Sequence, residues 1–124
     1  MMKKQVEFPL LEEYKKYFAV DKNTIFALGE HIYTNNDLTD DLLVHELVHL
    51  KQQEEMGVTE WVYDFLHDPE ARLRFEVQAY REQIKSIKDR NYRTKVLYQS
   101  AKNLSSALYG NIITNSQALE LLKI

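Results

Sequence analysis

Two histidines, His45 and His49, lie one helical turn apart in the segment HELVH, and Glu46 stands between them. Two imidazoles four residues apart project from the same face of a helix and can bind one tetrahedral zinc ion. Such an ion lowers the pKa of a bound water, and a neighbouring glutamate can accept the water's proton. This set of residues is used to hydrolyse peptide bonds, so the segment predicts a zinc-dependent hydrolytic site.

The residues around the motif predict a helix that is apolar on nearly every side. Such a helix is expected to be buried, and its ionisable groups would then cost several kcal/mol if they lacked partners. A shared metal ion would satisfy them together. The chain contains no cysteine, so the ligands of that ion must be nitrogen and oxygen atoms. The apolar positions are Leu43, Val44, Leu47, Val48 and Leu50.

The third ligand is expected downstream, as a carboxylate or histidine that points inward from another element. On the helix predicted after Asp68, Glu76 lies at the edge of the apolar arc. Glu82 points to the opposite face, and the first-turn position of Glu70 is explained by the helix dipole. Glu76 is therefore the glutamate that needs a buried partner. The arc consists of Leu73, Val77, Tyr80, Ile84 and Ile87.

HELVH followed 27 residues later by Glu76, in EVQAY, resembles the gluzincin branch of the zincin metallopeptidases. The longer run from HELVHLKQQEEMG to DPEARLRFEVQAYREQI is similar to small metallopeptidase-like proteins often encoded by bacteriophages and prophages. The resemblance covers roughly residues 24–90. It implies a zincin fold with an edge strand before the motif helix, and a peptide or protein substrate. It also implies that His45, His49 and Glu76 bind Zn²⁺ and that Glu46 is the general base.

The sequence departs from the larger gluzincins at Tyr80. Those proteins often have an acid four residues after the ligand glutamate, where it orients a histidine. A phenol can hydrogen-bond an imidazole but polarises it less than a carboxylate does. The sequence therefore predicts metal binding more directly than efficient catalysis. Tyr33, Tyr80 and Tyr109 are all open as the residue that stabilises the oxyanion. If the strand with His31 is the edge strand, His31 or Tyr33 could face the substrate.

Other interpretations of the motif are weighed against this one. Two core histidines could flank a surface glutamate. Glu46-x-x-His49 and Asp64-x-x-His67 match the spacing of di-iron bundles, although those bundles draw their ligands from four long helices. A zincin-fold protein could also keep zinc for stability and act by binding, for instance as a phage accessory protein. Glu46 favours the enzyme, because a structural site gains nothing from a base beside an open coordination position.

The elements that must position these residues follow from periodicity and end signals. Residues 10–18 predict a short helix, and residues 24–28 and 31–34 predict strands joined at a turn. The motif helix is expected to begin at Thr39 or Asp40 and to end before Gly57, with Lys51-Gln52-Gln53 as a largely solvated end. Asp68 and Pro69 open the next helix, and further helices are expected over 92–109 and 116–122. We expect one domain over residues 1–124, a helix-rich α+β zincin-like fold with a small sheet or hairpin before the motif helix.

Composition bounds the remaining possibilities for the 124-residue chain. Its net charge of −3 does not indicate a nucleic-acid-binding protein, and no basic stripe indicates binding to a membrane surface. The N-terminus lacks the apolar run of a signal peptide, so a cytoplasmic protein is expected. The resemblance implies a bacterial host cell and allows a phage or prophage origin. The oligomeric state is not predicted.

Overall fold

A computed structural model describes residues 1–123 and has the expected α+β class, rich in helix with a small sheet. As expected, the β2–β3 hairpin precedes the motif helix, α2. In chain order the elements are β1 (Met2–Lys3), the 3-10 helix η1 (Gln5–Glu7), α1 (Leu11–Lys15), β2 (Phe26–Leu28), β3 (His31–Tyr33), α2 (Asp40–Met56), α3 (Val58–His67), α4 (Pro69–Ser86), α5 (Arg90–Leu104), the 3-10 helix η2 (Ala107–Tyr109) and α6 (Asn115–Leu122).

The three strands have the order β1-β3-β2, with β1 parallel and β2 antiparallel to β3. Gly29 takes a positive φ of 63° in the β2–β3 turn, a conformation that suits glycine. The strand with His31 and Tyr33 is therefore central, and the expectation that it could be the edge strand is wrong. The reason is β1, whose two residues cover the second edge of β3 but are too few to produce a sequence pattern. The strand edge beside α2 belongs to β2.

Local signals set the ends of the two helices that matter most. Asp68 caps α4, since its Oδ1 accepts from the backbone N–H of Glu70 at 3.0 Å, and Pro69 occupies the first turn. α2 follows Thr39 and stops at Gly57, which has a φ of 102°. The helix expected over 92–109 is instead two elements, because α5 ends at Leu104 and η2 follows. At this break the Ser105 and Ser106 hydroxyls donate to the carbonyls of Lys102 and Asn103 in the last turn of α5.

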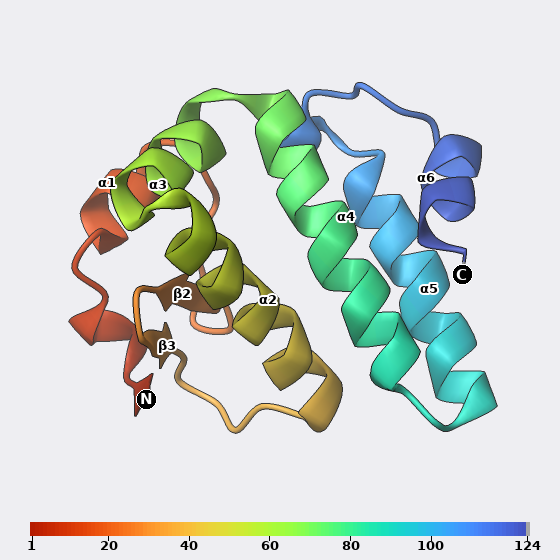
Figure 1. The fold of residues 1–124 in the computed structure, drawn as a ribbon, viewed down its shortest axis with the longest axis horizontal. Coiled ribbons are helices and arrows are strands. Elements are labelled where there is room, and N and C mark those ends of the chain that lie inside the picture. Colours follow the sequence, from red (N-terminus) through yellow and green to blue (C-terminus); the bar gives the residue numbers. More distant parts are fainter. Residues whose placement is uncertain (124) are drawn as a thin grey trace.

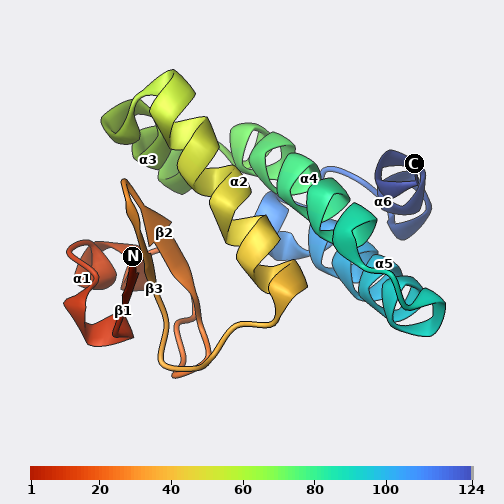
Figure 2. The same ribbon diagram turned by 60° about the horizontal axis from the view of Figure 1, so that its bottom comes forward.

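α2 lies between the sheet and the α4–α5 pair, as Figures 1 and 2 show from two sides. Each side has its own apolar cluster. On the sheet side, aromatic residues dominate: Phe8, Tyr14, Phe26 and Tyr33 with Leu66. On the other side, α4, α5, η2 and α6 share Leu73, Ile84, Ala101, Leu104, Tyr109, Ala118 and Leu122. The motif helix therefore stands at the boundary of two cores.

The buried positions of α2 are polar, and its apolar residues are half-buried or exposed. The buried ones are Asp41, His45, Glu46, His49, Gln52 and Gln53, whereas Leu47 is 39% exposed. The expectation of a helix buried on every side is therefore wrong, and so is that of a solvated Gln52-Gln53 end. The cause is tertiary, because β2, α3 and α4 all contact α2 and their contacts fall on its polar side.

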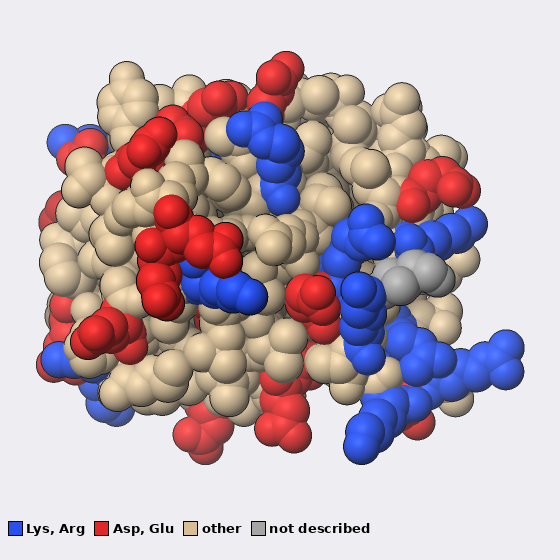
Figure 3. Space-filling model, in the orientation of Figure 1, with Lys and Arg blue, Asp and Glu red and all other residues tan. Residues whose placement is uncertain are grey.

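Charged side chains separate along the molecule despite the small net charge. Residues 1–68 contain 14 acidic and six basic side chains, whereas residues 69–124 contain five acidic and ten basic ones. In Figure 3 the basic side chains gather at the right, where Figure 1 places α4 and α5. Net charge alone thus conceals a polarised surface. Among residues 1–123, no helix combines the length and apolar composition that crossing a bilayer requires.

Gln53 joins α2 to the hairpin and yields a test of the fold. Its Nε2 donates to the Ala27 carbonyl at 2.9 Å, and its Oε1 accepts from the Gly29 N–H at 2.7 Å. Gln53→Leu should lower the free energy of unfolding by about 1–3 kcal/mol, because backbone groups at a buried contact lose their partners. Urea denaturation measures this. Glu54→Leu, at the exposed neighbouring position, is the control, and equal losses in both variants would contradict the assigned tie.

Candidate metal centre

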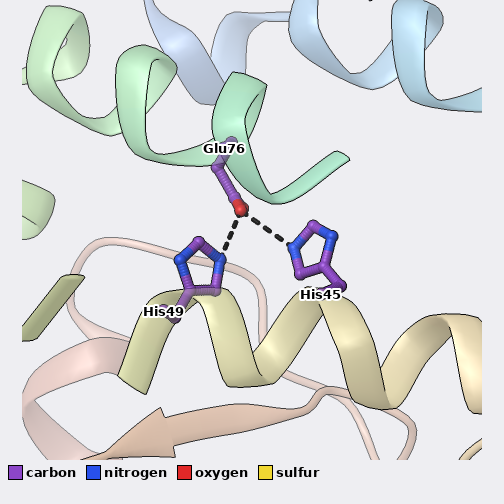
Figure 4. A group of neighbouring side chains, drawn as sticks. All are labelled: His45, His49 and Glu76. Atoms are coloured by element: carbon purple, nitrogen blue, oxygen red, sulfur yellow. Dashed lines mark hydrogen bonds and ion pairs between the residues drawn. The ribbon is translucent and has the colours of Figure 1, made fainter. Parts of the chain in front are cut away.

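His45 and His49 point from α2 toward Glu76 on α4, as Figure 4 shows. Their Nε2 atoms lie 3.0 and 2.6 Å from the same oxygen, Oε1 of Glu76. The three side chains are only 7%, 6% and 12% exposed, in that order. Within residues 1–123 they form the only group of three or more possible ligand residues whose ligand atoms all lie within 4.8 Å of one another. This buried group could hold a metal ion.

Helix register explains why these three residues meet. The four-residue spacing places both histidines on the side of α2 that contacts α4. The Asp68 cap and Pro69 fix the start of α4, which places Glu76 two turns further along, facing α2. Glu70 and Glu82 are exposed, and Glu82 lies 3.9 Å from Lys85. The structure therefore separates Glu76 from the other glutamates of the helix.

The imidazole of His49 has a fixed orientation and a fixed tautomer. Its Nδ1 lies 2.9 Å from Oε1 of Gln52, and the Trp61 indole N–H donates to the same oxygen at 3.1 Å. Gln52 Nε2 donates to the Phe75 carbonyl at 3.0 Å. The indole can only donate and the carbonyl can only accept, so the amide has one possible orientation. Nδ1 must then carry a proton, which leaves Nε2 of the neutral ring free to bind a metal ion.

His45 is held in the same way by a second glutamine. Its Nδ1 lies 2.8 Å from Oε1 of Gln83, and Gln83 Nε2 donates to the Asp41 carboxylate at 2.8 Å. The Tyr92 hydroxyl donates to Asp41 at 3.2 Å. A carboxylate only accepts, so Gln83 must present its oxygen to the imidazole. Both histidines thus offer Nε2 toward the same point.

The tyrosines left open by the sequence divide into two groups. Tyr80 packs edge-on against His45, with 4.6 Å between ring centroids, and its hydroxyl accepts from Asn103 at 3.3 Å. Tyr80 therefore does not orient the imidazole of His45; Gln83 does so through its Oε1. The Tyr109 hydroxyl donates to Oε2 of Glu76 at 2.9 Å. Tyr33 lies in the aromatic cluster around Phe8 and is not part of the site.

Arg72 holds the segment that carries Tyr109. Its guanidinium donates to the carbonyls of Phe65 and Leu66 at the end of α3, and to the carbonyl of Leu108 in η2. Because Leu108 immediately precedes Tyr109, this bond fixes the residue that reaches Glu76. One buried arginine therefore joins α3, α4 and η2 behind the centre.

The Glu76 carboxylate and the two imidazoles shift one another's pKa values. Burial lowers the pKa of His49, but the Glu76 carboxylate outweighs it and the pKa rises to about 9. The pKa of His45 is raised by the same balance. Burial raises the pKa of Glu76, and the two histidines more than reverse this, so it lies well below the usual range. Positive charge is therefore favoured where the three side chains meet. Two imidazole nitrogens and one carboxylate oxygen fit an ion that prefers nitrogen and oxygen ligands.

Glu46 differs from Glu76 in its surroundings. It is 7% exposed, and burial raises the pKa of its carboxyl. No hydrogen bond to its carboxylate is found among residues 1–123, whereas Glu76 has three partners. Glu46 lines two cavities that meet at the cluster. Its carboxylate is thus beside the candidate ligands without being committed to a protein partner.

The alternative interpretations of the histidines find no support in this geometry. Glu46 is buried, so it is not a surface glutamate between two core histidines. His67 is exposed and packs against the rings of Tyr63 and Tyr17, away from the cluster. Within the described chain, Asp64 and His67 do not belong to the possible metal group, so the di-iron spacing is not realised.

Comparison of the chain with known protein families, with curated proteins and with solved structures finds no match. The function must therefore be argued from the centre itself. Sequence reasoning missed the orienting residues Asp41, Gln52 and Gln83. Helical spacing was the available signal, since Asp41 precedes His45 by four residues, Gln52 follows His49 by three and Gln83 follows Glu76 by seven.

Removing an orienting amide should weaken metal binding without abolishing it. Gln52→Leu and Gln83→Leu should each lower metal affinity by about 10–100-fold, since the imidazoles lose the acceptors that fix their tautomers. Competition titration with a chromophoric chelator measures the change. Gln99→Leu is the matched control, because Gln99 is exposed on α5 and its amide donates to Asn103 rather than to a histidine. Unchanged affinity in both test variants would refute the orienting role.

Replacing Glu76, the third candidate ligand, should lower metal affinity further. Glu76→Ala should lower metal affinity by more than the roughly 100-fold upper value for an outer partner, because a direct ligand is lost. Glu82→Ala, on the exposed side of the same helix, should leave affinity unchanged. Metal content after purification and the same titration check both. Full metal retention by Glu76→Ala would exclude Glu76 as a ligand.

Proposed function

We propose that the chain is a zinc-dependent peptidase of the minimal gluzincin type. His45, His49 and Glu76 would bind Zn²⁺, and Glu46 would be the general base. The observation that carries this proposal is the contrast between two buried glutamates. Glu76 is held by both histidines and Tyr109, whereas Glu46 stands beside them with its carboxylate unbonded within the described chain.

Zinc suits the donor set better than calcium or magnesium, which prefer ligand shells made of oxygen. Three protein ligands are also the number used in catalytic zinc sites, where the fourth position stays open. When bound, zinc supplies a Lewis acid that lowers the pKa of water and polarises a carbonyl group.

The role of Glu46 is to move a proton. Its carboxylate can accept a proton from the water that attacks the peptide carbonyl carbon. It can then give this proton to the amide nitrogen as the C–N bond breaks, which regenerates the carboxylate and releases an amine. A base that already had a protein donor would have to lose that bond first, so the free carboxylate supports this role.

The edge of the sheet also supports a peptide substrate. Phe26 and Ala27 of β2, with Ile25 just before it, line the cavity that contains the candidate ligands. An extended peptide can add to an unpaired strand edge through its backbone, and the part of the β2 edge before Ala27 could serve, because Gln53 already bonds the Ala27 carbonyl and the Gly29 N–H. A non-catalytic protein that keeps zinc for stability is the alternative function, and it would have no use for Glu46 in this position.

Glu46→Gln separates the base from the ligands. The variant should keep its zinc and lose roughly 10²–10⁴-fold in the rate of peptide hydrolysis, because only the proton acceptor is removed. Hydrolysis of a denatured protein substrate by zinc-loaded enzyme measures activity, and elemental analysis measures zinc. Glu54→Gln, exposed on the same helix, is the matched control. Zinc loss in Glu46→Gln would disprove the assigned roles, and undiminished hydrolysis would disprove the base.

A further inference from the structure

Two cavities of different chemistry meet at the candidate metal centre. One has a volume of about 350 Å³ and the other of about 480 Å³, and both are lined by His45, Glu46 and Glu76. A volume of about 300–1,000 Å³ is typical of sites for small ligands, so each can receive part of a substrate. A peptide bound at the centre would therefore meet different surroundings on the two sides of the bond that is cut.

The smaller cavity has apolar walls and is called here the apolar arm. Beyond the centre, its walls include Phe18 and Val20 after α1, Ile25 before β2, Phe65 on α3 and Leu108 in η2. The connection from α1 to β2, α3 and η2 thus contribute aromatic or aliphatic side chains to one space. Burying a large apolar side chain there would be favourable in proportion to the apolar area removed from water.

A buried positive charge borders the apolar arm. The Arg72 guanidinium lies 5.0 Å from the ring centre of Phe18 and 5.7 Å from that of Phe65. Its hydrogen bonds go to neutral backbone carbonyls, and within residues 1–123 it forms no salt bridge. Burial lowers its pKa and the charges of Glu76 and Asp68 only partly offset this, so the guanidinium charge is not fully neutralised. A lysine or arginine side chain entering the arm would lose its hydration and meet a like charge. The arm should therefore exclude cationic side chains.

The larger cavity has more polar groups in its walls than the apolar arm and is called here the polar arm. α5 forms one wall with Tyr92, Lys95, Gln99 and Asn103, which present hydroxyl, ammonium and amide groups. Lys95 and Gln99 are exposed, so this arm is open to water. Its surroundings suit a hydrophilic part of a substrate.

We propose that the substrate is a peptide with a large uncharged apolar side chain next to the cleaved bond, bound in the apolar arm, and with polar residues on the other side of that bond, bound in the polar arm. Arg72 excludes lysine and arginine from the apolar arm. The inference rests on the proposed peptidase function. Leu108 is the wall residue best suited to a test, because its side chain is 43% exposed and its backbone carbonyl, which bonds Arg72, survives substitution.

The test uses internally quenched peptides with a polar sequence that differ at one position, which is Leu, Phe, Ala or Lys. The zinc-loaded protein should cleave the Leu and Phe peptides beside that residue with a kcat/KM at least about tenfold above the Ala peptide, since pocket contacts are worth such factors. The Lys peptide should be the poorest. Mass spectrometry of the products locates the bond and shows which side carries the apolar residue.

In Leu108→Glu the ratio of kcat/KM for the Leu peptide to kcat/KM for the Lys peptide should fall by about tenfold, because a carboxylate would offset the charge of Arg72. Leu121→Glu is the matched control, 42% exposed on α6 and outside both arms, and should keep the original ranking. Binding of the same peptides to zinc-loaded Glu46→Gln, followed by fluorescence anisotropy, gives the ranking without turnover.

The outcomes separate the two proposals. Cleavage or binding of the peptides without the order Leu and Phe above Ala above Lys would overturn the inference about the arms. The same conclusion would follow if Leu108→Glu left this order and its ratios unchanged. Binding with the expected ranking but no cleavage by the parent protein would support the arms and overturn the peptidase function.

Discussion

The buried carboxylate of Glu76, placed between two imidazoles, is the contact on which the rest of the structure depends. A carboxylate at this depth is costly unless opposite charges and hydrogen bonds surround it, and His45, His49 and Tyr109 provide them. The contact also joins α2 to α4, between the two apolar clusters, as Arg72 joins α3 to α4 and η2. The candidate ligands are thus part of what holds the two sides together. Metal binding and folding would therefore be coupled through the same atoms.

Neutral amides do the orienting work around this contact. Gln52 and Gln83 each fix a histidine tautomer without adding charge, while Asp41 stands one step further out. Glu46 and Glu76 already bring two buried carboxylates to this place. A third beside an imidazole would add repulsion there. The polar side of α2 is buried because β2, α3 and α4 pack against it, and the apolar residues of the helix are left half-buried or exposed.

Much of this centre could be predicted from local spacing, and the exceptions have a common cause. The i, i+4 histidines, the Asp68-Pro69 helix start and the position of Glu76 beside an apolar arc are all properties of single helices. The structure agrees with each of them. The central position of β3 and the burial of Gln52 and Gln53 depend on which elements pack together. From sequence alone, a glutamine at a helix end is expected to be solvated. Gln53 is buried because the β2–β3 turn lies against it, and Gln52 because the Trp61 indole does.

α4 fixes the spacing between four side chains of the centre. Arg72 holds the η2 segment, Glu76 meets both histidines, Tyr80 packs on His45 and Gln83 orients that ring, all from one unbroken helix. A helix turns by about 100° per residue, so one residue inserted after Arg72 would rotate Glu76, Tyr80 and Gln83 together away from α2. The same insertion in residues 111–114, between η2 and α6, would fall in a connecting segment that can absorb it. The length of this helix segment is therefore as tightly constrained as the identity of its residues.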